Sequence, residues 1–207
     1  MNIYLKLAIM SLVATSTSAF AYKDPSNATL PLYSLSVEYS QYNAEFDYGD
    51  EVELKGVAVG LSPNPHYSGI FGKLEFLNNK EFDLDYVELT TGAQMSLFKD
   101  PNFYALASLG IGYSWLSTDY FNNDATFFSL PVGFEVGMTP ISQLSIYGAI
   151  GYKWLWDVTS NTTCRDGTNT NRTGYNACAY NGGVAYYNDH LGDNSGMTYK
   201  AGLRLNF

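Results

Sequence analysis

Strict alternation of polar and apolar residues over the last eight positions is the feature that most limits the fold of this chain. Positions 201, 203, 205 and 207 are apolar, whereas positions 200, 202, 204 and 206 are polar or small. A period of two is that of a β-strand, whose successive side chains point to opposite faces. We therefore expect a strand with one apolar face that ends on Phe207.

Seven earlier segments alternate in a similar way, so we expect eight strands, at 32–42, 51–61, 68–77, 85–98, 103–115, 126–138, 144–156 and 196–207. In the second segment, Val52 and Leu54 give way to Val57 and Val59 near Gly56, and a β-bulge at that glycine would explain the change of parity. A soluble β-sandwich is the alternative, but all the outward aromatic residues would then have to share one core. Segments of this length suit a tilted membrane crossing of about 9 to 11 residues.

The connections alternate between short and long. Short segments rich in turn residues occupy 62–66, 99–102 and 139–143, whereas longer polar segments occupy 43–50, 78–84, 116–125 and 157–195. Short turns at one end and long loops at the other are typical of outer-membrane barrels. The sequence thus predicts an all-β fold, an eight-stranded antiparallel up-and-down transmembrane β-barrel.

The first 21 residues have the features of a secretory signal peptide. A short apolar stretch, too short to span a bilayer, precedes small residues that end at Ala21. We expect a signal peptide at 1–21 and one barrel domain at 22–207, with a long last extracellular loop at about 157–195. The formal net charge of -9 argues against a nucleic-acid partner.

The whole arrangement resembles the small Gram-negative outer-membrane barrels of the OmpA transmembrane domain, OmpX and opacity-protein group. In such proteins a polar residue, a glycine two positions later and two hydrophobic residues ending in a terminal aromatic form an assembly signal. The matching residues here are Lys200, Gly202, Leu205 and Phe207. The resemblance implies a cell outer-membrane location, with outer-membrane lipid, lipopolysaccharide and the barrel assembly machinery as partners, and a monomer.

Ten charged residues are expected on the inward faces of the strands: Glu38, Glu53, Lys55, Lys73, Glu75, Glu88, Glu135, Lys153, Lys200 and Arg204. The interior of an eight-stranded barrel is just wide enough for side chains to fill it. Charges buried there must pair, which predicts a lumen filled by salt bridges. The alternative is a narrow ion path gated by one of these pairs.

The last loop is the strongest candidate for a binding function. It contains Cys164 and Cys178, which fit a disulfide in an oxidising compartment, and Tyr, Asn and small residues of the kind found in adaptable binding loops. A metal site is the weaker alternative, because no second thiol pair or close His accompanies the two cysteines. A solvated loop that only shields the barrel is an equally simple interpretation.

No convincing catalytic set is present. His66 lies in a short turn, where we expect it to be solvated, and Asp189, His190 and Ser195 lack the spacing of known outer-membrane acyl hydrolases. The sequence therefore predicts a barrel with a structural or surface-interaction role, with no enzyme activity, cofactor or metal, and with an extracellular ligand or host surface as a partner. A narrow porin-like channel is the alternative, and a lipid-modifying enzyme is the remote one.

Overall fold

The structure is a computed structural model. It describes residues 31–46, 51–100, 102–118, 125–158, 162–170, 177–187 and 193–207, so the predicted signal peptide at 1–21 lies outside the described residues. Within these ranges, no helix is long and apolar enough to cross a membrane.

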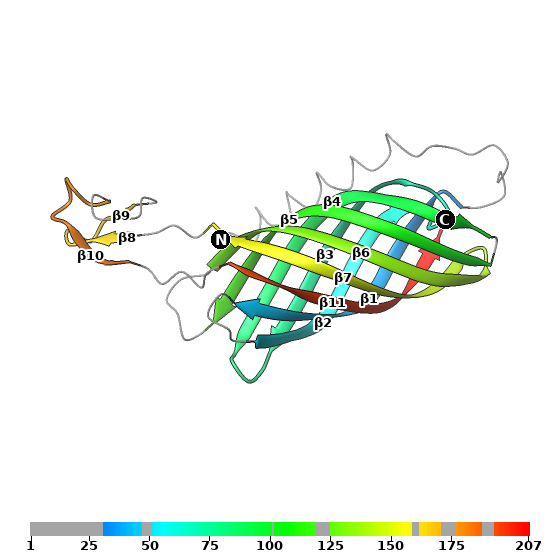
Figure 1. Ribbon diagram of the computed structural model, residues 1–207, viewed down its shortest axis with the longest axis horizontal. Helices are drawn as coiled ribbons and strands as arrows, with labels where there is room; N and C mark the ends of the chain where they lie inside the picture. Colours follow the sequence, from blue (N-terminus) through cyan, green and yellow to red (C-terminus); the bar gives the residue numbers. More distant parts are fainter. Residues whose placement is uncertain are drawn as a thin grey trace.

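Eight long strands close into one antiparallel barrel (Figure 1). They are β1 (Tyr33–Phe46), β2 (Glu51–Pro63), β3 (Gly69–Asn79), β4 (Leu84–Lys99), β5 (Phe103–Thr118), β6 (Ala125–Ile141), β7 (Leu144–Asp157) and β11 (Asn194–Asn206). Each strand pairs with its neighbour along the chain, apart from the short strands inserted after β7, and β11 closes the barrel on β1. The fold predicted from the alternation is therefore confirmed.

The register shows how strongly the strands are tilted. A row of paired residues that starts at Leu155 runs through β6, β5, β4, β3, β2, β1 and β11 and returns to β7 at Ser145. One circuit therefore shifts the register by ten residues, because 155 − 145 = 10. In a closed barrel such a stagger goes with a strand tilt of about 35–45°.

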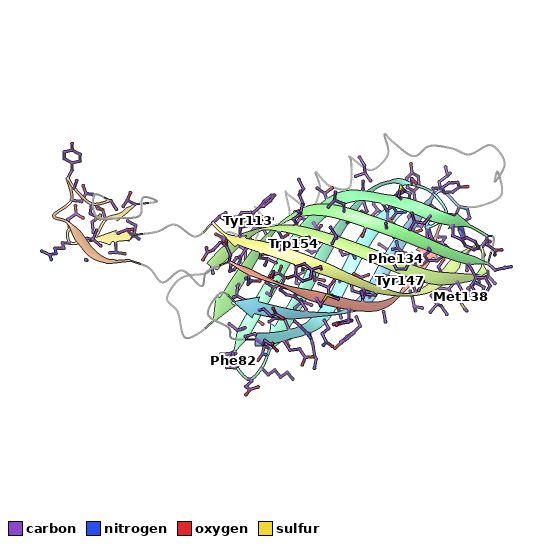
Figure 2. All side chains as sticks on the ribbon, in the orientation of Figure 1. Phe82, Tyr113, Phe134, Met138, Tyr147 and Trp154 are labelled. Atoms are coloured by element: carbon purple, nitrogen blue, oxygen red, sulfur yellow. A yellow bond between two sulfur atoms is a disulfide. The ribbon has the colours of Figure 1, made fainter. Side chains whose placement is uncertain are left out.

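The outer wall is apolar over most of its height and the inner wall is largely polar. Figure 2 shows Phe134 along the barrel wall. Tyr113 and Trp154 lie on the side of it toward the end with long loops, and Met138 lies toward the end with short turns. We call these ends the loop end and the turn end. The exposed fractions of Phe134 and Met138 are 46% and 45%, which is typical of side chains that face lipid rather than a core.

The second strand differs from the sequence prediction. Its register against β1 is continuous from Glu51 to Pro63, so there is no bulge at Gly56. Leu54 is buried inside the barrel, and Glu53 and Lys55 consequently point outward. The change of parity reflects a change of surroundings along one regular strand, not an extra residue.

A second, smaller sheet lies within the last loop. It consists of β8 (Thr162–Cys164), β9 (Asn169–Thr170) and β10 (Val184–Tyr187), in the order β10-β8-β9. The Cys164–Cys178 disulfide closes it, with a Cα–Cα distance of 5.5 Å, and confirms the predicted bond. Figure 1 draws this sheet apart from the barrel.

Candidate functional site

The best-defined cluster of charged side chains lies inside the barrel, and Lys153 on β7 is its member nearest the loop end. Its Nζ donates to Glu75 Oε2 on β3 at 2.6 Å and to Glu88 Oε2 on β4. Tyr86 donates to the same Glu88 carboxylate at 2.8 Å, and Ser40 donates to Glu75 Oε1 at 2.6 Å. Lys153 is 1% exposed, and these two carboxylates compensate its buried charge.

Two further lysines extend this cluster toward the turn end. Lys200 on β11 donates to Glu75 at 2.9 Å and lies 3.5 Å from Glu38 on β1. Lys73 on β3 donates to Glu38 Oε1 at 2.6 Å, and Tyr147 on β7 donates to Glu38 Oε2 at 2.5 Å. Glu75 and Glu38 are therefore each shared between two cations, which together with Glu88 links residues from five strands into one network.

Arg204 on β11 lies at the end of the network that is nearest the turn end of the barrel. Its guanidinium binds both oxygens of Glu135, at 3.1 and 2.7 Å, and also donates to Ser62 Oγ at 2.8 Å. The guanidinium carbon lies 4.7 Å from the ring centroid of Tyr147, the same tyrosine that donates to Glu38. Tyr147 thus connects the lysine cluster to the Arg204–Glu135 pair.

The resulting network is electrically balanced. Four acids (Glu38, Glu75, Glu88 and Glu135) face four bases (Lys73, Lys153, Lys200 and Arg204). Gly112 and Gly137 make room for it: a Cβ on Gly112 would lie 2.7 Å from Glu88 Oε1, and one on Gly137 would lie 2.5 Å from Tyr104 Oη. Tyr104 in turn donates to Glu135 at 2.9 Å.

Small cavities remain between the ion pairs. One of ≈ 70 Å³ is lined by the three lysines of the network together with Glu75 and Glu88, and another of ≈ 40 Å³ lies next to Arg204 and Ser36. A water molecule needs roughly 10–15 Å³ of such volume and two to four polar partners. Both cavities can hold ordered water, which would satisfy the hydrogen-bonding capacity that the ion pairs leave over.

Apolar side chains fill the barrel at its loop end. We call this cluster the apolar plug: Tyr42, Ala44, Leu54, Leu77, Tyr86, Leu116, Ala125, Phe127 and Leu155. Every long strand except β11 contributes, and Phe127 is 0% exposed. Tyr42 also donates to Asn194 on β11 at 2.6 Å, which extends the contact to the eighth strand. The lumen above the ion pairs is therefore packed like the core of a soluble protein.

The short β2–β3 turn fills the other end of the lumen. Residues 62–67 are all buried, and Gln94 on β4 donates to the backbone oxygens of Pro63 and Tyr67. His66 is 4% exposed, packs edge-on against Tyr104 and lies 3.2 Å from Thr139 Oγ1. Its burial lowers the pKa of the imidazole below 6.5. The expectation that His66 is solvated is wrong.

Of the ten charges predicted for the lumen, the structure brings eight together and places two elsewhere. Glu53 and Lys55 form an exposed ion pair of 2.6 Å on the outer wall, so their assignment to the lumen is wrong. The pattern misled because apolar residues of β2 near the loop end face the plug instead of lipid.

The remaining predicted residues are placed as follows. Lys200 and Gly202 face inward, whereas Leu205 and Phe207 are 56% and 64% exposed on the outer wall. Their recognition by an assembly machinery stays a prediction. Ser195 on β11 accepts a hydrogen bond from Tyr152 at 2.8 Å, while Asp189 and His190 lie outside the described residues.

The sequence analysis assigned no role to four tyrosines that donate hydrogen bonds inside the barrel: Tyr42, Tyr86, Tyr104 and Tyr147. Their signal was their parity, because each alternates with outward-facing residues of its strand. Within the described residues, no group of three or more His, Cys, Asp or Glu side chains is arranged as a metal site.

Comparison with known proteins gives the fold a context. No family model and no curated protein matches the chain. The crystal structure of Neisserial surface protein A is similar over 84% of this chain and 97% of that chain, with 11% identity and a TM-score of 0.55. Ail, the attachment invasion locus protein of Yersinia pestis, has 14% identity, coverage of 86% and 100%, and a TM-score of 0.47. A major outer membrane protein from Thermus thermophilus has 13% identity, coverage of 84% and 99%, and a TM-score of 0.44.

The similarity to Neisserial surface protein A agrees with the physical character of the barrel. The outer wall carries an apolar band that is unsuited to water, no strand edge of the barrel is left open, and the interior holds balanced charge. Those are the properties that a bilayer requires of a spanning sheet. The chain therefore has the fold of the small eight-stranded outer-membrane β-barrels, as the sequence predicted.

Proposed function

We propose that this barrel is a non-conducting surface-interaction protein that binds an extracellular partner through its loops. The observation that carries the proposal is the filling of the lumen. The apolar plug occupies the loop end, the ion network occupies the middle, and the β2–β3 turn occupies the turn end. With the interior occupied along its whole length, the surface left for function is the outside of the barrel and its loops.

The disulfide-closed sheet is the favoured binding element. Its covalent closure limits the conformations of the segment 164–178, which lowers the entropy lost on binding. Tyr180 next to this bridge is fully exposed, and an exposed tyrosine is a typical anchor of binding loops. Arg165 donates its backbone N–H to Gly183 O at 3.0 Å, so the chain around Tyr180 is held in place.

Binding can be tested with full-length protein in outer-membrane vesicles. We expect vesicles that carry the barrel to adhere to extracellular-matrix proteins or intact epithelial cells. Adhesion should be lost when a Gly/Ser linker replaces residues 162–187 and should weaken in Tyr180→Ala. Phe82→Ala is the matched control, because Phe82 is an exposed aromatic at a different loop. Equal adhesion of all variants, or none by the parent protein, would contradict the proposal.

Conduction is the competing function and has its own test. We expect planar bilayers containing the folded protein to stay electrically silent, because the plug, the ion network and the β2–β3 turn occupy the lumen, and the cavities found beside the ion pairs measure ≈ 70 and ≈ 40 Å³. Reproducible single-channel steps that change in Glu135→Gln would favour the narrow-channel alternative instead.

A further inference from the structure

The apolar plug provides a level inside the barrel at which opposite walls can be compared. Its members pack together as one cluster, so they lie at about the same height. In each strand the residues directly before and after a plug residue point outward, because side chains alternate. These neighbours therefore report what surrounds the barrel at that height.

The surroundings differ from wall to wall. On β1, Tyr42 lies between Gln41 and Asn43, and on β2, Leu54 lies between Glu53 and Lys55. On β7, by contrast, Leu155 lies between two tryptophans. The strands between β2 and β7 are intermediate, with one apolar and one polar neighbour: Phe76 and Asn78 on β3, Val87 and Asp85 on β4, Trp115 and Ser117 on β5, and Phe128 and Thr126 on β6.

The apolar band is correspondingly shorter, measured along the barrel axis, on the β1–β2 wall than on the β5–β7 wall. On β5 it runs from Phe103 to Trp115, which spans about 30 Å of height for a rise of about 3.3 Å per residue and a tilt of about 40°. On β1 it runs from Tyr33 to Tyr39, about 15 Å by the same reckoning. The apolar band of outer-membrane barrels is about 25 Å tall. The β5–β7 wall is tall enough for the bilayer and the β1–β2 wall is not.

The upper β1–β2 wall is built for a polar environment. Gln41 donates to Asn43 Oδ1 at 3.0 Å and to Glu53 Oε1 at 2.5 Å, and Glu53 pairs with Lys55. Behind this polar layer the wall is apolar, with Tyr42, Ala44 and Leu54 in the plug, as in a water-soluble β-sheet. The outer surface here also has a hollow of ≈ 370 Å³, which is lined by Asn43, Glu45, Glu51, Val52, Glu53, Met197 and Tyr199.

We propose that the outer leaflet is thinned beside β1 and β2, so that lipid headgroups and water descend along this wall to the level of Tyr39. The occupant of the polar wall is thus the headgroup layer itself. Tilting the barrel does not remove the mismatch, because the apolar band begins near the strand ends on both walls at the turn end, with Tyr33 and Leu35 on β1 and Phe103 on β5. The difference is one of band height.

Spin labels at three outward positions test the proposal in lipid vesicles. Cysteines for labelling are introduced by Val37→Cys, Gln41→Cys and Trp154→Cys in full-length protein that carries Cys164→Ser and Cys178→Ser. Gln41 and Trp154 are matched, since each directly precedes a plug residue on its strand. Heat-dependent gel mobility confirms that each labelled protein is folded.

We expect labels at positions 37 and 154 to be accessible to oxygen and protected from a water-soluble nickel chelate, as in lipid. The label at position 41 should show the opposite, with a several-fold higher chelate accessibility. A lipid-like signal at position 41 would overturn the proposal, because the bilayer would then keep its thickness. Protection of position 41 from both reagents would overturn it too, and would assign the wall to a protein partner.

A second measurement uses no label. The double variant Gln41→Leu with Glu53→Leu extends the apolar band of the β1–β2 wall. We expect its folding yield to rise relative to the parent in long-chain lipid vesicles and to stay equal or fall in short-chain ones. The same relative yield in both lipids would show that this wall does not sense bilayer thickness.

Discussion

The middle of the barrel and its loop end fill the same lumen with opposite chemistry. In the middle, four acids and four bases form one paired network, whereas a few residues above it the lumen is closed by buried aliphatic and aromatic side chains. Both fillings leave little space, but they depend on different forces. Removing one partner from the network leaves the other charge buried and unpaired, whereas removing a side chain from the plug only leaves a void.

The largest effect is expected from breaking the network at its most buried cation. Lys153→Met leaves Glu75 and Glu88 without their shared partner and should lower the free energy of unfolding by about 3–5 kcal/mol. Urea titration of the protein in lipid vesicles, followed by gel mobility, measures this change. Adding Glu88→Gln to the variant leaves three acids and three bases, with Glu75 still paired with Lys200, and should recover much of the loss. A double variant as unstable as the single one would indicate that packing, not charge, is what Lys153 supplies.

Truncation of the plug should cost less than loss of the lysine. Leu155→Ala removes a fully buried side chain, and we expect a loss of about 2–4 kcal/mol in the same titration. Ile150→Ala on the lipid-facing side of the same strand is the control, since it leaves no internal void. If Leu155→Ala were neutral, the loop end of the lumen would not be a packed core.

Acid should weaken the turn end before it affects the plug. His66 has a folded pKa below 6.5, so the unfolded chain takes up a proton more readily than the folded chain as the pH falls. The stability contributed by the neutral ring is complete above pH 6.5 and is lost as the pH falls through the folded pKa. Unfolding titrations between pH 7.5 and 5 should therefore show a decrease in the parent and a smaller one in His66→Gln. Parallel curves would contradict a role for His66.

The smallest effect on the barrel is expected from opening the disulfide. Replacing Cys164 and Cys178 by serine removes a cross-link between residues 14 positions apart. In the chain-entropy model this cross-link stabilises the loop by about 3 kcal/mol. The bond joins Cys164 at the end of β8 to Cys178 between β9 and β10, and neither residue belongs to a barrel strand. We expect unchanged heat-dependent mobility but faster cleavage by protease between Val158 and Asp193. A double variant that fails to insert would show that the loop contributes to barrel assembly.

The sequence predicted the architecture well because alternation is a local signal. Eight strands, their order and most inward charges follow from a period of two, and the structure confirms the fold. The exceptions on β2 have one cause: the prediction assumed lipid outside every strand over its full length. Above Tyr39 and Val57 the outside is polar, so the apolar residues of β1 and β2 turn inward, and Glu53 and Lys55 turn out.

The contacts of the candidate site were less predictable, because they join distant strands. Which lysine binds which glutamate depends on the ten-residue stagger, and a single sequence does not reveal it. His66 was misjudged for a similar reason. Turn residues are usually exposed, and only the depth to which residues 62–67 enter the barrel buries this imidazole.

The seam between β1 and β11 sets the order in which the protein can fold. It joins residues that are 172 positions apart, as in the bond from Ser34 Oγ to Asn206 Oδ1, and ends on two reciprocal backbone bonds between Tyr33 and Phe207. Until the seam forms, the sheet has two free edges, and free edges recruit other chains. Closure over such a separation is also slow compared with the pairing of neighbouring strands. We therefore expect seam formation to limit the folding rate, with aggregation competing against it at high protein concentration.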